Sequence, residues 1–384
     1  MSSKYLAPLV LVVLISLLAA CNPAPPATAT PASAPTQKVE QKPAWETTWA
    51  NLVAEGKKEG KVTVYSTIPA DISRDLGKRF NDQFGIELEF VTGRGAEVIQ
   101  KLQTERRAGL YLGDAATLSV QQFVANDLRS MMDPVVPLLM RPDVTDTSKW
   151  LGGKLPILDR EGDILAFIGQ RASFQIYNTD MVKEGELPTI RAFADPKWRG
   201  KIVMMDPTVL SSATNWYQFA LRKQLGGVEP GRAYMKELAK NVAATTMDYR
   251  MLNEWVARGK YAIAVPVRAD EAIVFMREGA PIKFVESASD PQRIGASWGT
   301  IEALKNRPHP KATQVFINWL MTRENLAAVS KASGLPMTRV DVPTEGLTPY
   351  IIPRAGDLGE DEDSYQELNA MLEWAKEDFA IIKK

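Results

Sequence analysis

Residues 61–91 read KVTVYSTIPADISRDLGKRFNDQFGIELEFV and hold two short strands on either side of an amphipathic helix. The strands are predicted over 61–66 and 86–91, where β-branched and aromatic residues are common. Between them, Ile72 and Leu76 belong to a set of apolar residues that recur at the spacing of one helix face. Because parallel strands need a crossover of this length, usually a helix, the stretch predicts a parallel sheet.

The same alternation of strands and helices continues along the chain in two series. In the first, a helix begins near Trp45 and a third strand is predicted over 113–118. A stretch rich in Pro and Gly follows at 133–162, and the second series begins near Phe174. We therefore expect an α/β fold built from two doubly wound parallel units. The second series is predicted to contain strands over 174–179, 201–205, 261–266 and 281–286 and helices over 213–225 and 248–258.

Composition excludes several classes of function. The 384 residues include 46 Lys+Arg and 46 Asp+Glu, so the formal net charge is zero and a nucleic-acid partner is not expected. One Cys and one His count against a disulfide scaffold and against a zinc site. A His-based catalytic triad would have to use His309, which stands between two prolines before a predicted helix. No nucleotide or metal motif is recognisable, so we expect no cofactor.

The first 43 residues are predicted to lie outside the fold. Residues 1–20 carry one lysine and then a mostly apolar run that is too short for a membrane span, which predicts an export signal. The only cysteine follows Leu-Ala-Ala, a pattern similar to the bacterial lipoprotein signal, so lipidation of Cys21 is expected. The alternative is an ordinary signal peptide with a chance cysteine. The Pro/Ala/Thr-rich stretch that completes 21–43 predicts a tether between the anchor and the fold.

Candidate ligand contacts follow the predicted strands, because α/β sheets bind ligands at the carboxyl ends of their strands. In the first series these are Ser66 and Thr67 after one strand and Arg94, between two glycines, after the next. In the second series Asp206 and Thr208 open a loop rich in hydroxyl groups. Helix N-termini in such loops favour anions, so the pattern predicts an anion site.

The remaining candidates each have a structural alternative. Ser211 and Ser212 precede a helix, where serine is also a favoured N-cap. Arg250 and Arg268 offer guanidinium groups near strand ends, but each could equally form a surface salt bridge. Trp298 could stack on a ligand, although packing in the core is the better expectation.

Several segments together resemble the family 1 bacterial extracellular solute-binding proteins, and most of all their ferric-iron-binding-like branch. The resemblance extends over residues 44–340 and rests on the order and spacing of motifs that are individually modest. The motifs are EGKVTVYS at 59–66, YNTD at 177–180, DPKWRGKI at 195–202, GKYAI at 259–263 and PHPKA at 308–312, which runs on to FINWL at 316–320.

The resemblance implies a type 2 periplasmic-binding fold, in which two α/β lobes close on a solute and deliver it to an ABC-transporter permease. Two crossings, near 166–173 and 286–295, would join the lobes. The implied protein is monomeric, is not an enzyme, and resides at the cell surface or in the periplasm as a membrane-anchored lipoprotein. The expected parts are a signal peptide at 1–20, the lipidated cysteine and tether at 21–43, a first lobe at 44–165 and 290–340, a second lobe at 166–289 and a helical tail at 341–384.

The nature of the solute is less well defined. Iron-binding relatives typically hold Fe(III) with a tandem tyrosine pair, yet this sequence contains no Tyr-Tyr and reads AVPVRAD at the matching place, 264–270. The resemblance also makes Tyr177 a candidate contact. An arginine repels a cation, so we expect a small organic or phosphorylated anion. Ferric or chelated iron is the alternative, and an exported enzyme that uses Asp206 or Asp270 is the weaker one.

Overall fold

Two mixed sheets, each covered by its own helices, make up most of the structure. The computed structural model describes residues 43–287, 289–365 and 368–383. The predicted export signal, the lipidation site at Cys21 and all of the tether except Pro43 lie outside these ranges. Within them, no helix has both the length and the apolar character needed to cross a membrane.

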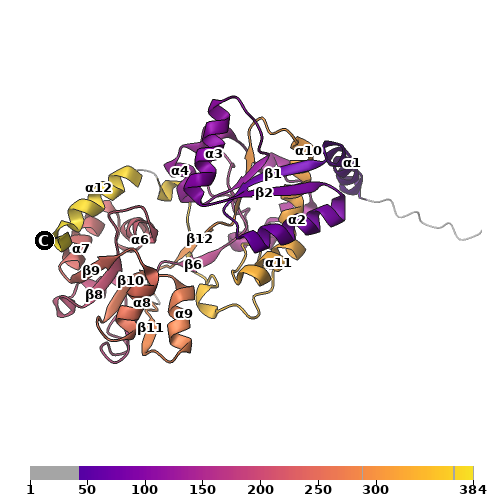
Figure 1. Cartoon of the computed structure of the whole chain (residues 1–384). Coiled ribbons are helices and arrows are strands. Elements are labelled where there is room, and N and C mark those ends of the chain that lie inside the picture. The colour runs from indigo at the N-terminus through magenta and orange to yellow at the C-terminus, as the bar shows by residue number, and fades with distance from the viewer. Residues whose placement is uncertain (1–42, 288, 366–367, 384) are drawn as a thin grey trace, which may run out of the picture. The chain divides into compact units, whose positions relative to one another are not determined.

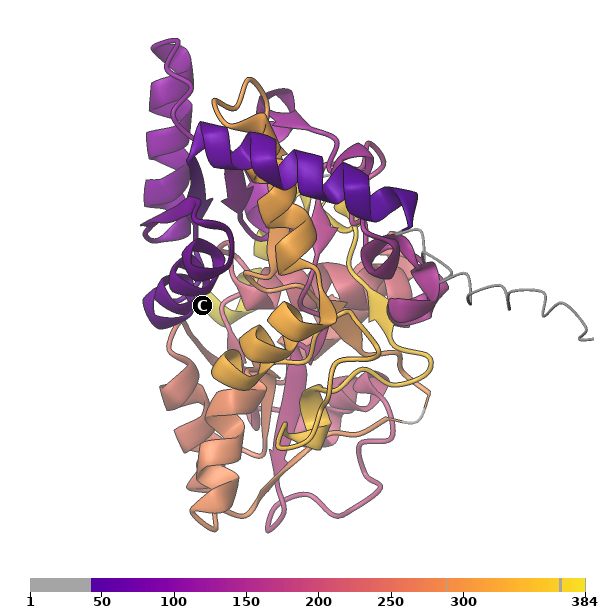
Figure 2. The same ribbon diagram turned by 90° about the vertical axis from the view of Figure 1, so that its right-hand side faces the viewer.

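The first sheet contains the stretch that predicted the fold. Strands β1 (Lys61–Ser66) and β2 (Glu87–Thr92) pair in parallel, with Lys61 opposite Glu87, and β3 (Ala115–Thr117) pairs with the other edge of β1. The connecting helix α2 (Ala70–Phe84) ends where Gly85 adopts a φ of 66°, which glycine tolerates without strain. Its apolar face is buried, as the sequence predicted. Helices α1 (Ala44–Glu59), α3 (Gly95–Arg107), α4 (Val120–Ala125), α5 (Pro142–Thr145), α10 (Pro310–Leu320) and α11 (Arg323–Ser333) accompany this sheet, with α1 packed along α10 (Figure 2).

The other strands of the first sheet correct the expectation of a purely parallel sheet. Strand β13 (Thr300–Leu304) runs antiparallel to β3, β4 (Met132–Asp133) and β5 (Leu165–Ala166). It is reached only after the chain has built the second sheet, so it enters the first sheet from the opposite direction. An alternation of strands and helices in the sequence predicts parallel strands that are joined by crossover helices. It does not predict the direction of a strand that joins the sheet after the chain has passed through another sheet.

The second sheet has the order β11-β7-β10-β8-β9. Three neighbouring strands, β8 (Ile202–Met205), β9 (Val242–Thr246) and β10 (Ile263–Val267), are parallel, with β9 at the edge. Strand β7 (Phe174–Asn178) is antiparallel to both of its neighbours, β10 and β11 (Ile282–Phe284). Its helices are α6 (Ser212–Phe219), α7 (Val228–Ala239), α8 (Tyr249–Ala257) and α9 (Ala269–Arg277) (Figure 1). The helix predicted over 213–225 corresponds to α6 and a π-helical turn that follows it, Ala220–Gln224.

A small third sheet joins strands from three distant parts of the chain. Strand β12 (Arg293–Gly295) lies between β6 (Gln170–Ala172) and β14 (Leu358–Gly359). Strands β6 and β12 fall within the two predicted crossings, and β14 adds a segment of the tail. The buried Arg293 forms an ion pair with Glu360, which also accepts hydrogen bonds from the Ala296 N–H at 2.6 Å and from the Tyr365 hydroxyl at 2.6 Å. The limits of the two lobes given above stay a prediction.

The end of the tail packs on the second sheet's helices. Helix α12 (Leu368–Asp378) lies against α6 and α7 (Figure 1). At its end the buried Asp378 accepts a hydrogen bond from the Tyr217 hydroxyl at 2.6 Å and pairs with Arg232 at 3.0 Å. A buried hydrogen-bonded charge of this kind fixes the position of the helix, because either partner alone would be left desolvated.

Glu302 on β13 is a buried carboxyl group without a matching cation. Its side chain is fully inaccessible, and neither carboxylate oxygen has a hydrogen-bond partner among the described residues. Burial raises the pKa of Glu302 well above the ordinary glutamate value, and the negative charges of Asp159 and Asp163 raise it further. Folding therefore favours the protonated form of Glu302.

We predict that Glu302→Gln removes a pH dependence of stability. In the unfolded wild-type chain Glu302 ionises above its ordinary pKa, whereas in the folded chain it stays protonated until a higher pH. Folding stability therefore falls as pH rises through this window, by up to about 1.4 kcal/mol per pH unit. The neutral amide has no such cost, so the variant should melt near the wild-type temperature at pH 4.5 and progressively above it toward pH 8.

Thermal unfolding of wild type, Glu302→Gln and the control Glu278→Gln across this pH range tests the prediction. Glu278 is exposed, so its variant should follow the wild-type profile. Wild-type and Glu302→Gln profiles that stay parallel from pH 4.5 to 8 would contradict the assignment of a protonated Glu302.

Candidate functional site

The carboxyl ends of three parallel strands meet at one edge of the second sheet. β10, β8 and β9 are consecutive neighbours, and each leads into a helix: α9, α6 and α8. The free N–H groups of helix N-termini carry partial positive charge, so three of them at one sheet edge favour an anionic ligand.

The loop after β8 is shaped by hydrogen bonds among the predicted site residues. Asp206 Oδ1 accepts from the Thr208 N–H at 2.8 Å and from its hydroxyl at 2.6 Å. The Ser211 hydroxyl donates to the Asp206 carbonyl oxygen at 3.2 Å and accepts from the Ala213 N–H at 3.1 Å. Ser211 is therefore an N-cap of α6, and Asp206 and Thr208 brace the loop that precedes it.

Ser212, Tyr249 and Arg268 come together from the loops of β8, β9 and β10, and we call them the donor cluster. The Tyr249 hydroxyl donates to Ser212 Oγ, and the Arg268 guanidinium lies 5.7 Å from the centre of the Tyr249 ring. Arg268 Nε also donates to Asp270 Oδ1 at 3.0 Å. The hydrogen bond to Asp270 raises the pKa of Arg268, which keeps the guanidinium charged.

Tyr249 is the site residue that the sequence reasoning missed. It is the first residue of α8 and follows β9, a strand that was also missed because VAATT lacks large apolar residues and is partly exposed at the sheet edge. The sequence did contain a signal close to Tyr249, because its neighbour Arg250 was selected as a candidate ligand contact. In the structure Arg250 is exposed, with its guanidinium 6.0 Å from the ring centre of Phe275.

The candidates on the first sheet are placed differently. Ser66 is fully buried and its hydroxyl lies 2.8 Å from that of Thr117, while the Thr67 hydroxyl donates to the Thr117 carbonyl oxygen at 3.2 Å. Arg94 is exposed at the N-terminus of α3, where its N–H donates to the Glu97 carboxylate at 3.1 Å. Of these three residues, only Arg94 is exposed.

Two further candidates lie in hydrophobic cores. Tyr177 on β7 is 9% exposed and belongs to the core of the second sheet. Trp298 is half-buried against the core of the first sheet, with its ring 6.0 Å from that of Phe167. Packing is therefore the observed role of both rings, and the donor cluster is formed without them.

A direct hydrogen bond joins two helices that accompany different sheets. Gln121 Nε2 on α4 donates to Asn215 Oδ1 on α6 at 2.9 Å. Since α6 begins at Ser212, the contact lies one helical turn from the donor cluster. It ties the first sheet's helices to the helix that carries the site.

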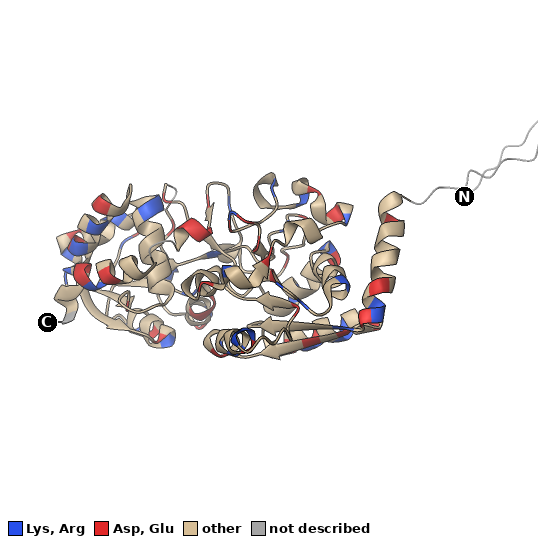
Figure 3. Ribbon diagram, turned by 90° about the horizontal axis from the view of Figure 1, so that it is seen from above, with Lys and Arg blue, Asp and Glu red and all other residues tan. Residues whose placement is uncertain are grey.

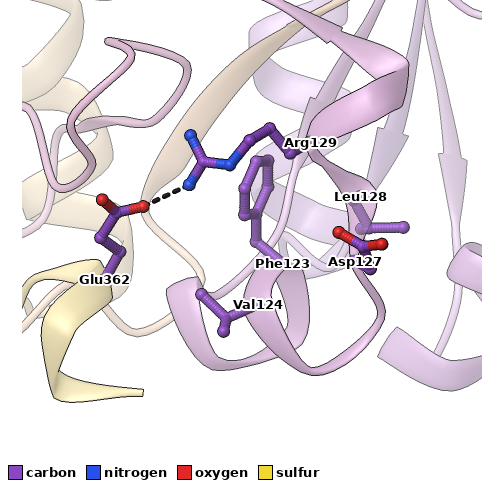
Figure 4. Close-up of a pocket in the computed structure, with 6 residues that line it drawn as sticks. All are labelled: Phe123, Val124, Asp127, Leu128, Arg129 and Glu362. Atoms are coloured by element: carbon purple, nitrogen blue, oxygen red, sulfur yellow. Dashed lines mark hydrogen bonds and ion pairs between the residues drawn. The ribbon is translucent and has the colours of Figure 1, made fainter. Parts of the chain in front are cut away.

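A second cluster of charged residues surrounds a cavity of about 190 Å³ beside Phe123, Leu128 and Arg129 (Figure 4). Three carboxylates near it, those of Asp159, Glu161 and Glu362, have oxygen atoms within 4.8 Å of one another. However, the Arg129 guanidinium already lies among them and forms ion pairs with all three. A resident cation of this kind makes the cluster an ion-pair network that attaches the tail to the first sheet, rather than a metal site.

The chemistry of the donor cluster is that of anion recognition. It presents hydroxyl groups, a guanidinium and helix N-termini, all of which donate hydrogen bonds or carry positive charge. Three carboxylates in the same loops are already engaged, that of Asp206 by Thr208, that of Asp248 by the Met251 N–H and that of Asp270 by Arg268. Because hard cations require several free anionic oxygen ligands, these residues do not suit a bare metal ion.

Comparisons with known proteins identify the family. The family model for bacterial extracellular solute-binding proteins matches residues 75–349. Iron uptake protein A2 of Synechocystis sp. is 27% identical over 257 residues, which cover 62% of this chain and 68% of that protein.

Solved structures confirm the type 2 periplasmic-binding fold. FutA of Trichodesmium, in complex with iron and citrate ligands, superposes with a TM-score of 0.65 at 18% identity, over 83% of this chain and 99% of that one. AfuA of Actinobacillus pleuropneumoniae, with fructose-6-phosphate bound, gives a TM-score of 0.58 at 16% identity, over 84% and 99% of the two chains. The chain belongs to the bacterial extracellular solute-binding proteins, the capture components of ABC importers.

Proposed function

We propose that the protein captures an anionic iron(III) chelate and delivers it to an ABC-transporter permease. The sequence favoured an organic or phosphorylated anion and kept ferric or chelated iron as its alternative. The relatives support the alternative, because they include an iron uptake protein and a structure with iron and citrate ligands. An anionic iron(III) chelate is consistent both with these iron-binding relatives and with the hydrogen-bond donors of the site.

The donor cluster is the observation that carries this proposal. In a chelate such as iron(III) citrate, the hard metal is already bound by carboxylate and hydroxyl oxygens. The outer oxygens of the complex are then acceptors for Arg268 and for the hydroxyl groups of Ser212 and Tyr249. Bare Fe(III) would instead need ligands that the donor cluster lacks and would be repelled by the guanidinium.

The charge on the ligand must be recognised locally. Lysine and arginine are interspersed with aspartate and glutamate along the helices (Figure 3), and the net charge of the chain is zero. Long-range steering by the whole protein is therefore weak, and affinity depends on short-range donors. We further propose that the mature protein is a monomer attached to the membrane through Cys21, which leaves the fold free to reach its permease partner.

We predict that iron(III) citrate raises the melting temperature of the protein, whereas iron-free citrate does so much less. A ligand that binds only the folded state stabilises it by mass action, by about 2.7 kcal/mol at a free concentration of 100 times Kd. Differential scanning fluorimetry with iron(III) citrate, citrate and fructose-6-phosphate measures this. A rise with fructose-6-phosphate and none with iron(III) citrate would favour sugar-phosphate capture instead.

We also predict that Arg268→Ala weakens binding of iron(III) citrate. Losing a hydrogen bond to a charged group costs about 1.5–3 kcal/mol, which corresponds to roughly 10- to 150-fold in Kd. Arg277→Ala is a matched control, because Arg277 is the exposed last residue of α9, whereas Arg268 is the N-cap residue at the other end. Titration calorimetry that gives wild-type affinity for Arg268→Ala would contradict a role of this guanidinium in ligand binding.

A further inference from the structure

Four exposed apolar side chains border the donor cluster. Val209 and Leu210, in the loop after β8, are 41% and 47% exposed. Met247 and Met251, after β9 and in the first turn of α8, are 54% and 40% exposed. We call these four residues the apolar rim.

Hydrogen bonds place the two halves of the apolar rim on adjacent loops. Asp206 N–H donates to the Thr246 carbonyl oxygen at 3.0 Å, which joins the two loops where they leave the sheet. The Thr246 hydroxyl lies 3.8 Å from the sulfur of Met251. The Thr214 hydroxyl on α6 donates to the Val209 carbonyl oxygen at 2.8 Å, which holds that loop against α6.

Two members of the donor cluster, Ser212 and Tyr249, lie on the same two loops. Tyr249 stands between Met247 and Met251 in the sequence, and Ser212 follows Leu210 by two residues. The bond from the Tyr249 hydroxyl to Ser212 Oγ therefore links the half of the rim that contains the methionines to the half that contains Val209 and Leu210. Polar donors and large apolar groups share one surface.

A single exposed apolar residue needs no explanation, but several around convergent polar groups are typical of a ligand site. Methionine adds a further signal, since its flexible and polarisable side chain adapts to ligand shape and contacts aromatic rings favourably. A small, wholly polar chelate would leave this apolar area unused.

We propose that the ligand carries an apolar portion, preferably an aromatic ring, which packs on Val209, Leu210, Met247 and Met251 while its anionic oxygens meet the donor cluster. This inference rests on the proposed function, and it narrows the ligand to iron(III) chelates of aryl-bearing acids. The guanidinium and hydroxyl groups recognise the charge of the chelate, and the apolar rim selects among chelates of equal charge.

A matched pair of chelates tests this inference. Lactate and mandelate bind iron through the same hydroxyl and carboxylate oxygens and differ in a methyl against a phenyl group. We expect iron(III) mandelate to bind about tenfold or more tightly than iron(III) lactate, by analogy with the burial of a few methylene groups. The double variant Met247→Ser/Met251→Ser, and separately Leu210→Ser, should cut this preference to about threefold or less.

Met181→Ser is the control, because Met181 is also 40% exposed but lies outside the two loops. It should keep the full preference for mandelate, and none of these variants should alter the affinity for iron(III) citrate by more than about twofold. Equal binding of the mandelate and lactate chelates by the wild type, with citrate still bound, overturns the inference alone. Absence of binding to all three iron chelates overturns the proposed function and this inference together.

Discussion

The buried ion pair between Arg293 and Glu360 holds together the strands that join the two sheets. Both side chains are less than 10% exposed, and Glu360 also accepts hydrogen bonds from Ala296 and Tyr365. An unpaired charge in this place would be strongly destabilising, by about 3–5 kcal/mol when one partner is removed. The pair therefore fixes β12 against the tail segment that contains β14. Residues 293–296, which lead from the second sheet back to the first, are held in place by this ion pair.

The direction of the strands follows from these connections. The chain enters the second sheet through β6 and β7 and returns to the first through β12 and β13. The strands that enter and return, β7 and β13, are antiparallel to their neighbours, whereas β8, β9 and β10 remain parallel. Only parallel strands place their carboxyl ends at one edge, so the helix N-termini that form the donor cluster depend on this division.

Local pattern in the sequence was sufficient for much of this architecture. The strand predicted over 61–66 is β1 itself, and the type 2 periplasmic-binding fold was expected from motifs spread over the chain. The antiparallel direction of β13 was not predictable from its own residues, because it depends on the path of the chain through the second sheet before β13. Two of the three residues of the donor cluster, Ser212 and Arg268, were predicted. Tyr249 was not, because it follows an edge strand of small residues that leaves little hydrophobic signal.

The distinction between a cation site and a chelate site depends on which oxygens are free. Asp270 would be a hard ligand for iron if it were alone, but its carboxylate holds the Arg268 guanidinium, which in turn lies over the Tyr249 ring. A metal ion bound at the Tyr249 oxygen would also compete with the hydrogen bond between that oxygen and Ser212. Metal binding by these side chains would thus cost an ion pair and a hydrogen bond, whereas an anionic chelate uses the guanidinium as it already stands. The same residues that disfavour binding of the bare metal ion favour binding of the ion once the carboxylate groups of a chelator surround it.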